Sequence, residues 1–385
     1  MFLKGTVAGF SPLFKHIVKA SAPWALTHLH LGGNFVILPI HPQGIHMSKL
    51  LLITPILTLL CCTATFAQPR SISNIVGESN ITDEDELKIQ KFAIGWAEEL
   101  LTTDADALER AHKKLISPFD ETARMTPHGR SLYGKYLKEG FESLLSVDND
   151  NEMAAVNALQ VYSLLGTEQA CSLLIKYAHS SAENRDALRL WASIGLGTTF
   201  LVGELPQNRV ERYANLLHDY IANETVWYVL SRQFDSLAAL QAIPGLDRDQ
   251  RNEMTELSFS LQTSALEKLL ASIDALEADE RVQSLSLVLP SLRLQLNEPG
   301  INEQVKADTF NSIIPPLVVF VENAANNPLA HEDDLFDAYG RAVHSAGLLI
   351  SMGLNVGGGV NVGELWNEEN YSDILKLVES WKSNQ

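Results

Sequence analysis

The chain has 385 residues, 46% of them hydrophobic, and its 29 basic and 47 acidic residues give a net charge of −18 at neutral pH. Phosphate backbones and anionic lipid head groups repel such an acidic protein, so we do not expect nucleic acid as a partner. The length allows one elongated domain or two compact ones.

Residues 47–67 have the layout of a secretory signal peptide, although they do not begin the chain. Lys49 supplies the positive charge, residues 50–62 form an apolar core, and small residues precede a predicted cleavage after Ala67. The core is shorter than the roughly 20 apolar residues that a membrane-spanning helix needs. We therefore predict export to the periplasm or the extracellular space, with no integral membrane span after cleavage.

Residues 1–46 are interpreted as a disordered upstream leader that precedes the true start at Met47. The first 67 residues hold four lysines but no acid and no arginine, whereas transit peptides are rich in Arg and Ser. Without these lysines the chain keeps 25 basic and 47 acidic residues, a net charge of −22. Cys61 and Cys62 at the end of the apolar core leave a lipid-anchored form as a minor alternative.

Residues 68–82 lack helical periodicity and are predicted to be a flexible linker. Thr82 is then followed by acids, with Asp85 at the third helical position, which is typical of a helix start. A helical domain is predicted from there over residues 83–385, with a possible subdomain over residues 300–385.

A second helix is predicted to start at Thr126, because Pro127 follows it at the first helical position. A proline there costs no intrahelical hydrogen bond, since the first N–H groups of a helix have no partner within it. The apolar pattern predicts that this helix runs to about Leu145.

Residues 151–197 carry the clearest helical pattern. Apolar residues recur there at spacings of three and four, and Gly166 can end the first helix in a left-handed conformation. Thr167 opens the next helix and places Cys171 on its apolar side, which predicts a buried thiol rather than a nucleophile. A shift of 31 residues superposes Gly166 on Gly197, so a second helix end is predicted at Gly197.

This stretch resembles HEAT-like α-helical repeats, in which a helix ending in LLG or GLG is followed by a polar turn and a second amphipathic helix. It departs from them because it lacks the Asp and Arg or Lys turn residues expected of better repeats, and the period fades after Gly197. The resemblance implies an all-α fold built as an irregular α-solenoid of stacked helix pairs. A large helical bundle is the alternative.

Amphipathic patterns predict further helices near residues 206–222, 225–241, 247–276, 278–297 and 332–353, and a last one that ends near Trp381. The stretch LVLPSLRLQL at 287–296 alternates like a strand after Pro290, but its surroundings favour helix. Four tryptophans on the apolar sides of helical patterns are predicted to lie in the core: Trp191, Trp227, Trp366 and Trp381.

No local motif nominates a catalytic, cofactor-binding or metal-binding residue. GRSLYGKY at 129–136 matches part of a phosphate-binding loop, but Tyr136 replaces the hydroxyl that binds magnesium and a predicted helix already uses those N–H groups. DNDNE at 148–152 lacks the Gly and Glu of a calcium loop. HEDD at 331–334 is typical of a first helical turn.

Two classes of function fit these patterns, and a structural protein of the envelope with no specific ligand is a third possibility. Abundant amphipathic helix without a catalytic motif favours an exported scaffold that binds another protein, because stacked helix pairs form a long concave surface. The alternative is an all-α envelope enzyme, for example one that processes glycans with two carboxylates. No cofactor is expected in either case.

Overall fold

The structure, a computed structural model, describes residues 69–385 except for residues 121–124, 274–277, 328–332 and 357–360. The predicted leader and signal peptide lie outside the described residues. Residues 68–385 form one compact unit. All regular secondary structure within the described residues is α-helix or 3-10 helix, without a strand, so the all-α class is confirmed. None of the described helices is both long enough and apolar enough to cross a membrane.

The first part of the unit holds the helices α2 (Ser73–Val76), α3 (Asp83–Glu99), α4 (Ala105–Ile116), η2 (Ser117–Phe119), α5 (Pro127–Phe141), α6 (Glu152–Ser163), α7 (Glu168–Tyr177) and α8 (Asp186–Val202). The second part holds α9 (Gln207–Ile221), α10 (Trp227–Ala238), η3 (Ala239–Ala242), α11 (Arg248–Ser272), α12 (Val282–Leu296), α13 (Glu303–Asn326), α14 (Asp333–Gly353), α15 (Val362–Asn367) and α16 (Tyr371–Lys382). Pro290 lies inside α12, so the helix prediction for that ambiguous stretch is confirmed.

The predicted helix starts are confirmed by their capping hydrogen bonds. The hydroxyls of Thr82, Thr126 and Thr167 each accept the backbone N–H of the third helical residue, at 3.3, 3.1 and 3.2 Å. Gly166 lies in the left-handed region with φ 60°, as predicted for a residue that ends a helix. These local signals fix where α3, α5, α6 and α7 begin or end.

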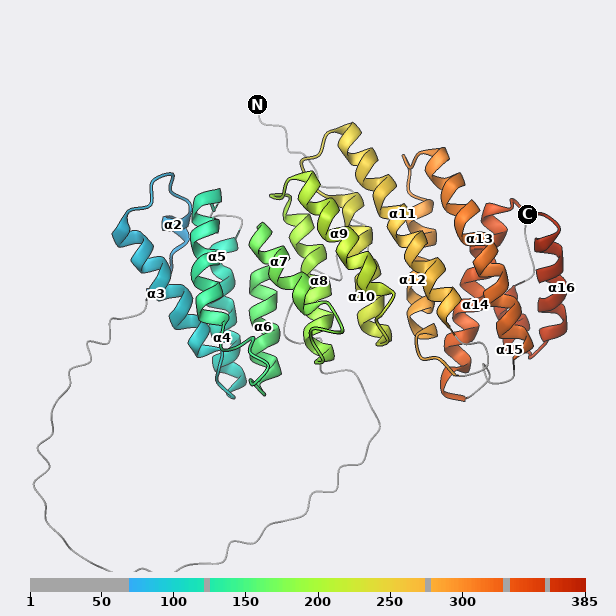
Figure 1. The fold of residues 1–385 in the computed structure, drawn as a ribbon, viewed down its shortest axis with the longest axis horizontal. Coiled ribbons are helices and arrows are strands. Elements are labelled where there is room, and N and C mark those ends of the chain that lie inside the picture. The colour runs from blue at the N-terminus through green and yellow to red at the C-terminus, as the bar shows by residue number, and fades with distance from the viewer. Residues whose placement is uncertain (1–68, 121–124, 274–277, 328–332, 357–360) are drawn as a thin grey trace, which may run out of the picture. The chain divides into compact units, whose positions relative to one another are not determined.

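From α6 onward the helices alternate between two rows. The α8 row consists of α6, α8, α10, α12 and α14, and each of them packs against the next member. The α9 row consists of α7, α9, α11 and α13, packed in the same way. Successive helices therefore follow one another in chain order, as Figure 1 shows for the described unit. α13 packs on α11 and α14 on α12, so the packing continues across residue 300.

The helices of the α8 row run in the same direction. Near the ends of α8 and α6, the Thr199 hydroxyl donates to the Ser163 carbonyl at 3.0 Å. At the start of α8, the Arg189 guanidinium binds Glu224, which lies three residues before the first residue of α10, at 2.9 Å. The starts of these helices consequently share one edge of the row, called here the start edge.

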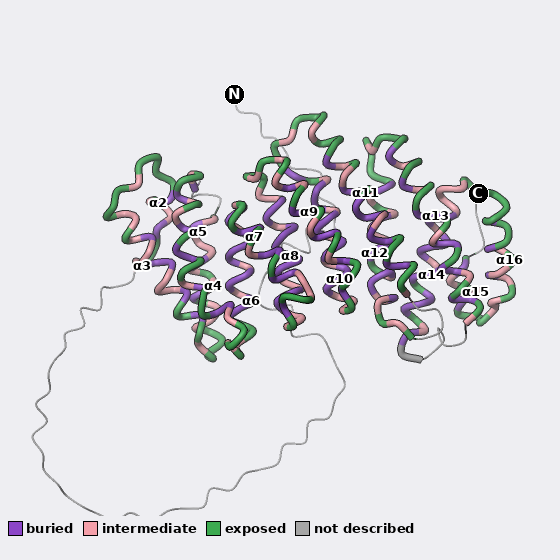
Figure 2. Tube along the Cα trace, in the orientation of Figure 1, coloured by how far each residue is buried: buried purple, intermediate pink, exposed green. Residues whose placement is uncertain are grey.

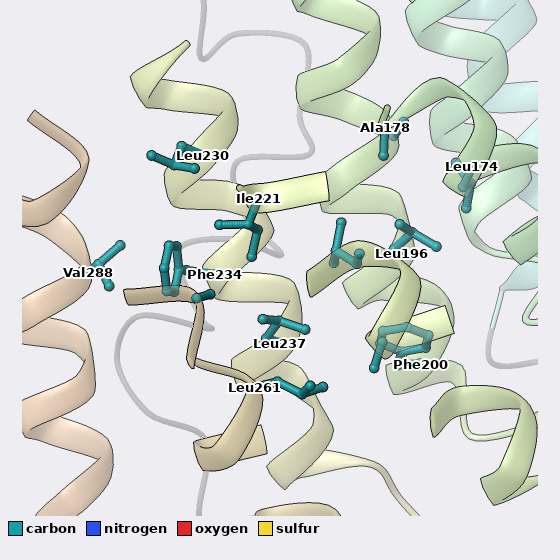
Figure 3. Close-up of a cluster of buried hydrophobic side chains, with 14 of the residues drawn as sticks. Leu174, Ala178, Leu196, Phe200, Ile221, Leu230, Phe234, Leu237, Leu261 and Val288 are labelled. Atoms are coloured by element: carbon teal, nitrogen blue, oxygen red, sulfur yellow. The ribbon is translucent and has the colours of Figure 1, made fainter. Parts of the chain in front are cut away.

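The core is one cluster of buried hydrophobic side chains that both rows contribute. Figure 3 shows a part of it, in which Leu196 and Phe200 of α8 and Phe234 of α10 lie near Ile221 of α9 and Leu261 of α11. Burial of side chains of this size contributes about 1.5–3 kcal/mol each. The two rows are thus held together chiefly by apolar packing.

Gly197 does not end a helix, which corrects the prediction of a 31-residue repeat. It lies inside α8, which ends only at Gly203 with φ 74°. A Cβ on Gly197 would lie 2.9 Å from the hydroxyl oxygen and 3.2 Å from the Cα of Ser236 on α10. The glycine is required by the close approach of α8 and α10 instead of by a turn.

Residues 72–76 also differ from the predicted linker over residues 68–82. They include the short helix α2, and the side chains of Ile72 and Val76 are buried in the core. The Val76 carbonyl accepts a hydrogen bond from the Thr126 backbone N–H at 2.9 Å, which ties this segment to the start of α5. Two buried apolar residues are enough to attach this segment to the core, although two are too few to form a periodic pattern in the sequence.

Candidate protein-binding surface

One side of α8 is apolar where solvent reaches it. α6 and α10 flank this helix and α7 packs against it, so its accessible side faces away from the α9 row. Arg189 is buried, and Asp186 in the first turn is the other charged residue of the helix. The partly exposed positions recur at spacings of three and four, and only Asp186 among them is charged: Asp186, Ala187, Leu190, Trp191, Ile194, Thr198, Leu201 and Val202.

α12, on the other side of α10, also presents apolar residues to solvent. Leu287 and Leu294 are 49% and 53% exposed and lie seven residues apart, which is two helical turns and the same side of the helix. Pro290 is partly exposed between them. Arg293 is the one charged residue in α12. The described part of the chain therefore leaves about half of each leucine side chain uncovered.

The remaining helices of the α8 row add few unpaired charges. Arg232 and Asp235 of α10 form an ion pair at 2.7 Å. On α14, Asp337 and Arg341 are exposed one turn apart. We define the α8-row face by its exposed or partly exposed apolar residues: Met153, Leu164, Leu190, Trp191, Ile194, Leu201, Leu287, Pro290, Leu294 and Leu348.

The opposite side of the unit, formed by the α9 row, is polar. Exposed positions along its helices carry amides, hydroxyls and charges: Asn208, Arg212, Asn215 and Asp219 on α9, Asn252, Glu256, Ser260 and Glu267 on α11, and Gln304, Asp308, Asn311 and Asn323 on α13. Val319 of α13, 51% exposed, is an apolar exception. Figure 2 shows the buried stretches that run between exposed stretches along the helices.

Of the four tryptophans predicted to lie in the core, two are buried and two are only partly buried. Trp366 and Trp381 are buried, as predicted. Trp191 and Trp227 are only partly buried, which corrects the prediction for these two. Trp191 packs with one side against the core and presents the rest to solvent on the α8-row face. Large, rigid aromatic side chains that remain accessible are common anchors of protein interfaces.

Ion pairs at the start edge hold α6, α8 and α10 in register. Arg189 binds Glu224 through two nitrogens, at 2.9 and 3.2 Å, and both side chains are buried. One Glu224 oxygen also accepts the N–H groups of Thr225 and Val226, each at 3.0 Å, so it satisfies donors at the start of α10. Losing one partner of such a pair costs about 3–5 kcal/mol.

A second ion pair extends this network to α6. Arg185 binds Glu183 through two nitrogens at 2.8 and 2.7 Å, and donates to the carbonyls of Ser146 and Asn149 just before α6. Burial alone would raise the pKa of Glu183, but hydrogen bonds from Arg185 hold it below the ordinary value of 4.5. The turn before α8 therefore does contain the acidic and Arg residues that the sequence pattern did not reveal.

The segments that suggested chemistry take structural roles. Residues 129–136 lie inside α5, as predicted. In DNDNE, the Asn151 side chain accepts the Ala154 N–H at 3.1 Å and caps α6, which confirms the cap interpretation. Burial raises the pKa of the Cys171 thiol to about 12, with Glu168 adding to the effect. HEDD at 331–334 lies outside the described side chains.

The described residues do not assemble a metal-binding group. No set of three or more His, Cys, Asp or Glu side chains is arranged there to hold a metal ion. Burial raises the pKa of Asp235, yet the group 2.7 Å from its carboxylate is the Arg232 guanidinium instead of a second acid. The two-carboxylate enzyme remains a prediction from sequence.

Comparison with protein-family models, with curated proteins and with solved structures finds no match for this chain.

Proposed function

We propose that residues 83–385 form an irregular HEAT-like α-solenoid that binds another protein on its α8-row face. Three features support the solenoid: packing between helices two places apart, parallel helices within the α8 row, and ion-paired turns at the start edge. Repeats of this kind stack so that each unit contacts chiefly its neighbours, which leaves long surfaces free for partners.

The observation that carries the binding proposal is the exposed pair Leu287 and Leu294 on α12, in the same row of helices as the accessible apolar residues of α8 and separated from them by the Arg232–Asp235 ion pair of α10. Large exposed apolar side chains gathered on one side of a protein mark an interaction site. The net charge of the described unit is strongly acidic, so the polar rim of the partner is expected to be basic and nucleic acid is not expected there.

Affinity measurements on matched variants test this function. The partner is first isolated by crosslinking to the full chain in cells, then purified, and its dissociation constant is measured for each variant. Leu287→Ser combined with Leu294→Ser should weaken binding at least about tenfold, since interface anchors commonly contribute 2 kcal/mol or more. Val319→Ser, equally exposed on the α9 row, should leave the dissociation constant unchanged. Equal losses in both variants would contradict the proposal.

We also propose that residues 47–67 act as a signal peptide and that the functional protein begins at Gln68 outside the cytoplasm. The support is the order of Lys49, apolar core and small residues. Mass spectrometry of the native N-terminus, combined with cell fractionation, decides the matter. An N-terminus at Gln68 in the exported fraction is expected, whereas an intact Met1 in the cytoplasm would overturn the assignment.

A further inference from the structure

A serine, a histidine and an aspartate lie in hydrogen-bonded order on the α9 row. The Ser264 hydroxyl of α11 is 3.2 Å from His218 Nε2 of α9, and His218 Nδ1 is 3.1 Å from the Asp219 carboxylate. The Lys268 ammonium, one turn after Ser264, is 3.4 Å from the same Nε2. The chain thus brings together four groups that lie up to 50 residues apart in sequence.

The exposure of these groups suits a reaction at the surface. The His218 side chain is largely buried, while Ser264 is partly exposed and Lys268 is exposed. When Nδ1–H donates to Asp219, Nε2 is left as an acceptor for the Ser264 proton. That is the tautomer which a general base for a serine requires. No hydrogen bond from the Ser264 hydroxyl to the carbonyl of its own helix competes for this proton within the described contacts.

We propose that Ser264 is a nucleophile activated by His218 and that the site accepts a small acyl ester. This activity is separate from partner binding, because the site lies on the α9 row. Ser264 Oγ forms a bond to the ester carbonyl carbon while its proton moves to His218 Nε2. The tetrahedral intermediate then collapses, the ester C–O bond breaks, and the leaving alkoxide takes the proton from His218. Water, activated by His218 in the same way, cleaves the acyl-serine and releases the acid.

Lys268 holds the negative charge that develops on the substrate oxygen. Ser264 lies in the middle of α11, where the neighbouring N–H groups already serve the helix, so backbone donors are not available for an oxyanion. The Asp219 carboxylate, 3.1 Å from Nδ1, fixes the orientation of the imidazole ring, and Asp219 therefore acts as a positioning residue.

Labelling of the full-length protein with a fluorophosphonate probe tests the proposal. Attack by Ser264 on phosphorus expels fluoride, and the modified peptide is identified by mass spectrometry. We expect the label on Ser264 and none on Ser260, which is exposed on the same helix without a histidine partner. Ser264→Ala should abolish this label, while Ser260→Ala leaves the labelling rate unchanged.

Two further variants separate catalysis from folding. His218→Gln should slow labelling about a hundredfold, the contribution of a general base. Because this ring is largely buried, the exposed Asp219 provides an independent test: Asp219→Asn should slow labelling at an unchanged melting temperature, and Asp219→Glu should restore part of the rate. An unlabelled Ser264 in the native protein, or equal rates in wild type and Asp219→Asn, would overturn the proposal.

Discussion

The two rows of helices differ in how they are tied together and in what they show to solvent. The α8 row is joined by close helix approaches at glycine and by buried ion pairs at the start edge, and its accessible side carries exposed apolar residues among a few charges. The α9 row has exposed ion pairs such as Arg209 with Glu168, and its accessible side is polar. A rigid row with an apolar side is suited to hold a partner, whereas the polar row is suited to face water.

The largest difference between the rows should appear when their arginines are removed. Arg189→Met leaves the buried Glu224 without its cation, so the free energy of unfolding should fall by about 3–5 kcal/mol. Arg209→Met removes an exposed pair and should cost no more than about 1 kcal/mol. Urea unfolding of both variants measures these values. Similar losses would remove the contrast between the rows.

A methyl group at Gly197 should disturb the α8 row specifically. Gly197→Ala places a Cβ against the hydroxyl and backbone of Ser236 on α10, so we expect a loss of about 1–3 kcal/mol. Gly134→Ala in α5 is the matched control, because the nearest atom to its Cβ, at 3.2 Å, is the flexible end of Leu165. Thermal unfolding should show a lower melting temperature for the first variant and little change for the second.

Acid should weaken the start edge through Glu183. The pKa of Glu183 in the folded protein is below its ordinary value of 4.5, so its stabilisation is complete above that pH and is lost as the pH falls through the lower folded value. Unfolding free energies of wild type and Glu183→Gln should therefore differ by a constant amount from pH 7 to 5 and converge in more acidic solution. If the difference in unfolding free energy between wild type and Glu183→Gln instead grew below pH 4.5, the pKa of Glu183 would be raised in the folded protein.

The smallest effect is expected at Cys171, on the inner side of the α9 row. Burial keeps this thiol protonated, and the thiolate is the reactive form. An aromatic disulfide reagent should not modify Cys171 in the native protein but should modify it fully in urea. Rapid modification without denaturant would mean that the α9 row opens from its polar side.

Local signals allowed many of the helices to be predicted, although α4 and α13 were not, and the relation between the rows could not be predicted. Thr82, Thr126 and Thr167 cap the next turn of their own chain, so their sequence context suffices. A glycine that ends a helix and one that admits a neighbouring helix look alike in sequence, which is why Gly197 was assigned wrongly. The neighbour that distinguishes them, Ser236, lies on another helix.

The candidate sites were hidden for the same reason. Arg189 and Glu224 are 35 residues apart, and Ser264 and His218 are 46 apart, so no motif joins them. Leucines at three- and four-residue spacing predict a buried side, yet Leu287 and Leu294 belong to a second apolar side of α12. Only the packing of α12 between α10 and α14 shows which of its leucines remain accessible.

Site-specific photo-crosslinking tests the central claim that the α8-row face binds a protein. A benzophenone-bearing residue replaces Leu287 in one version of the full chain and Val319 in another, since the two positions are equally exposed on opposite rows. After irradiation of living cells, the account predicts one defined protein crosslinked from position 287 and none from position 319. Equal crosslinking from both positions, or from position 319 alone, would contradict it.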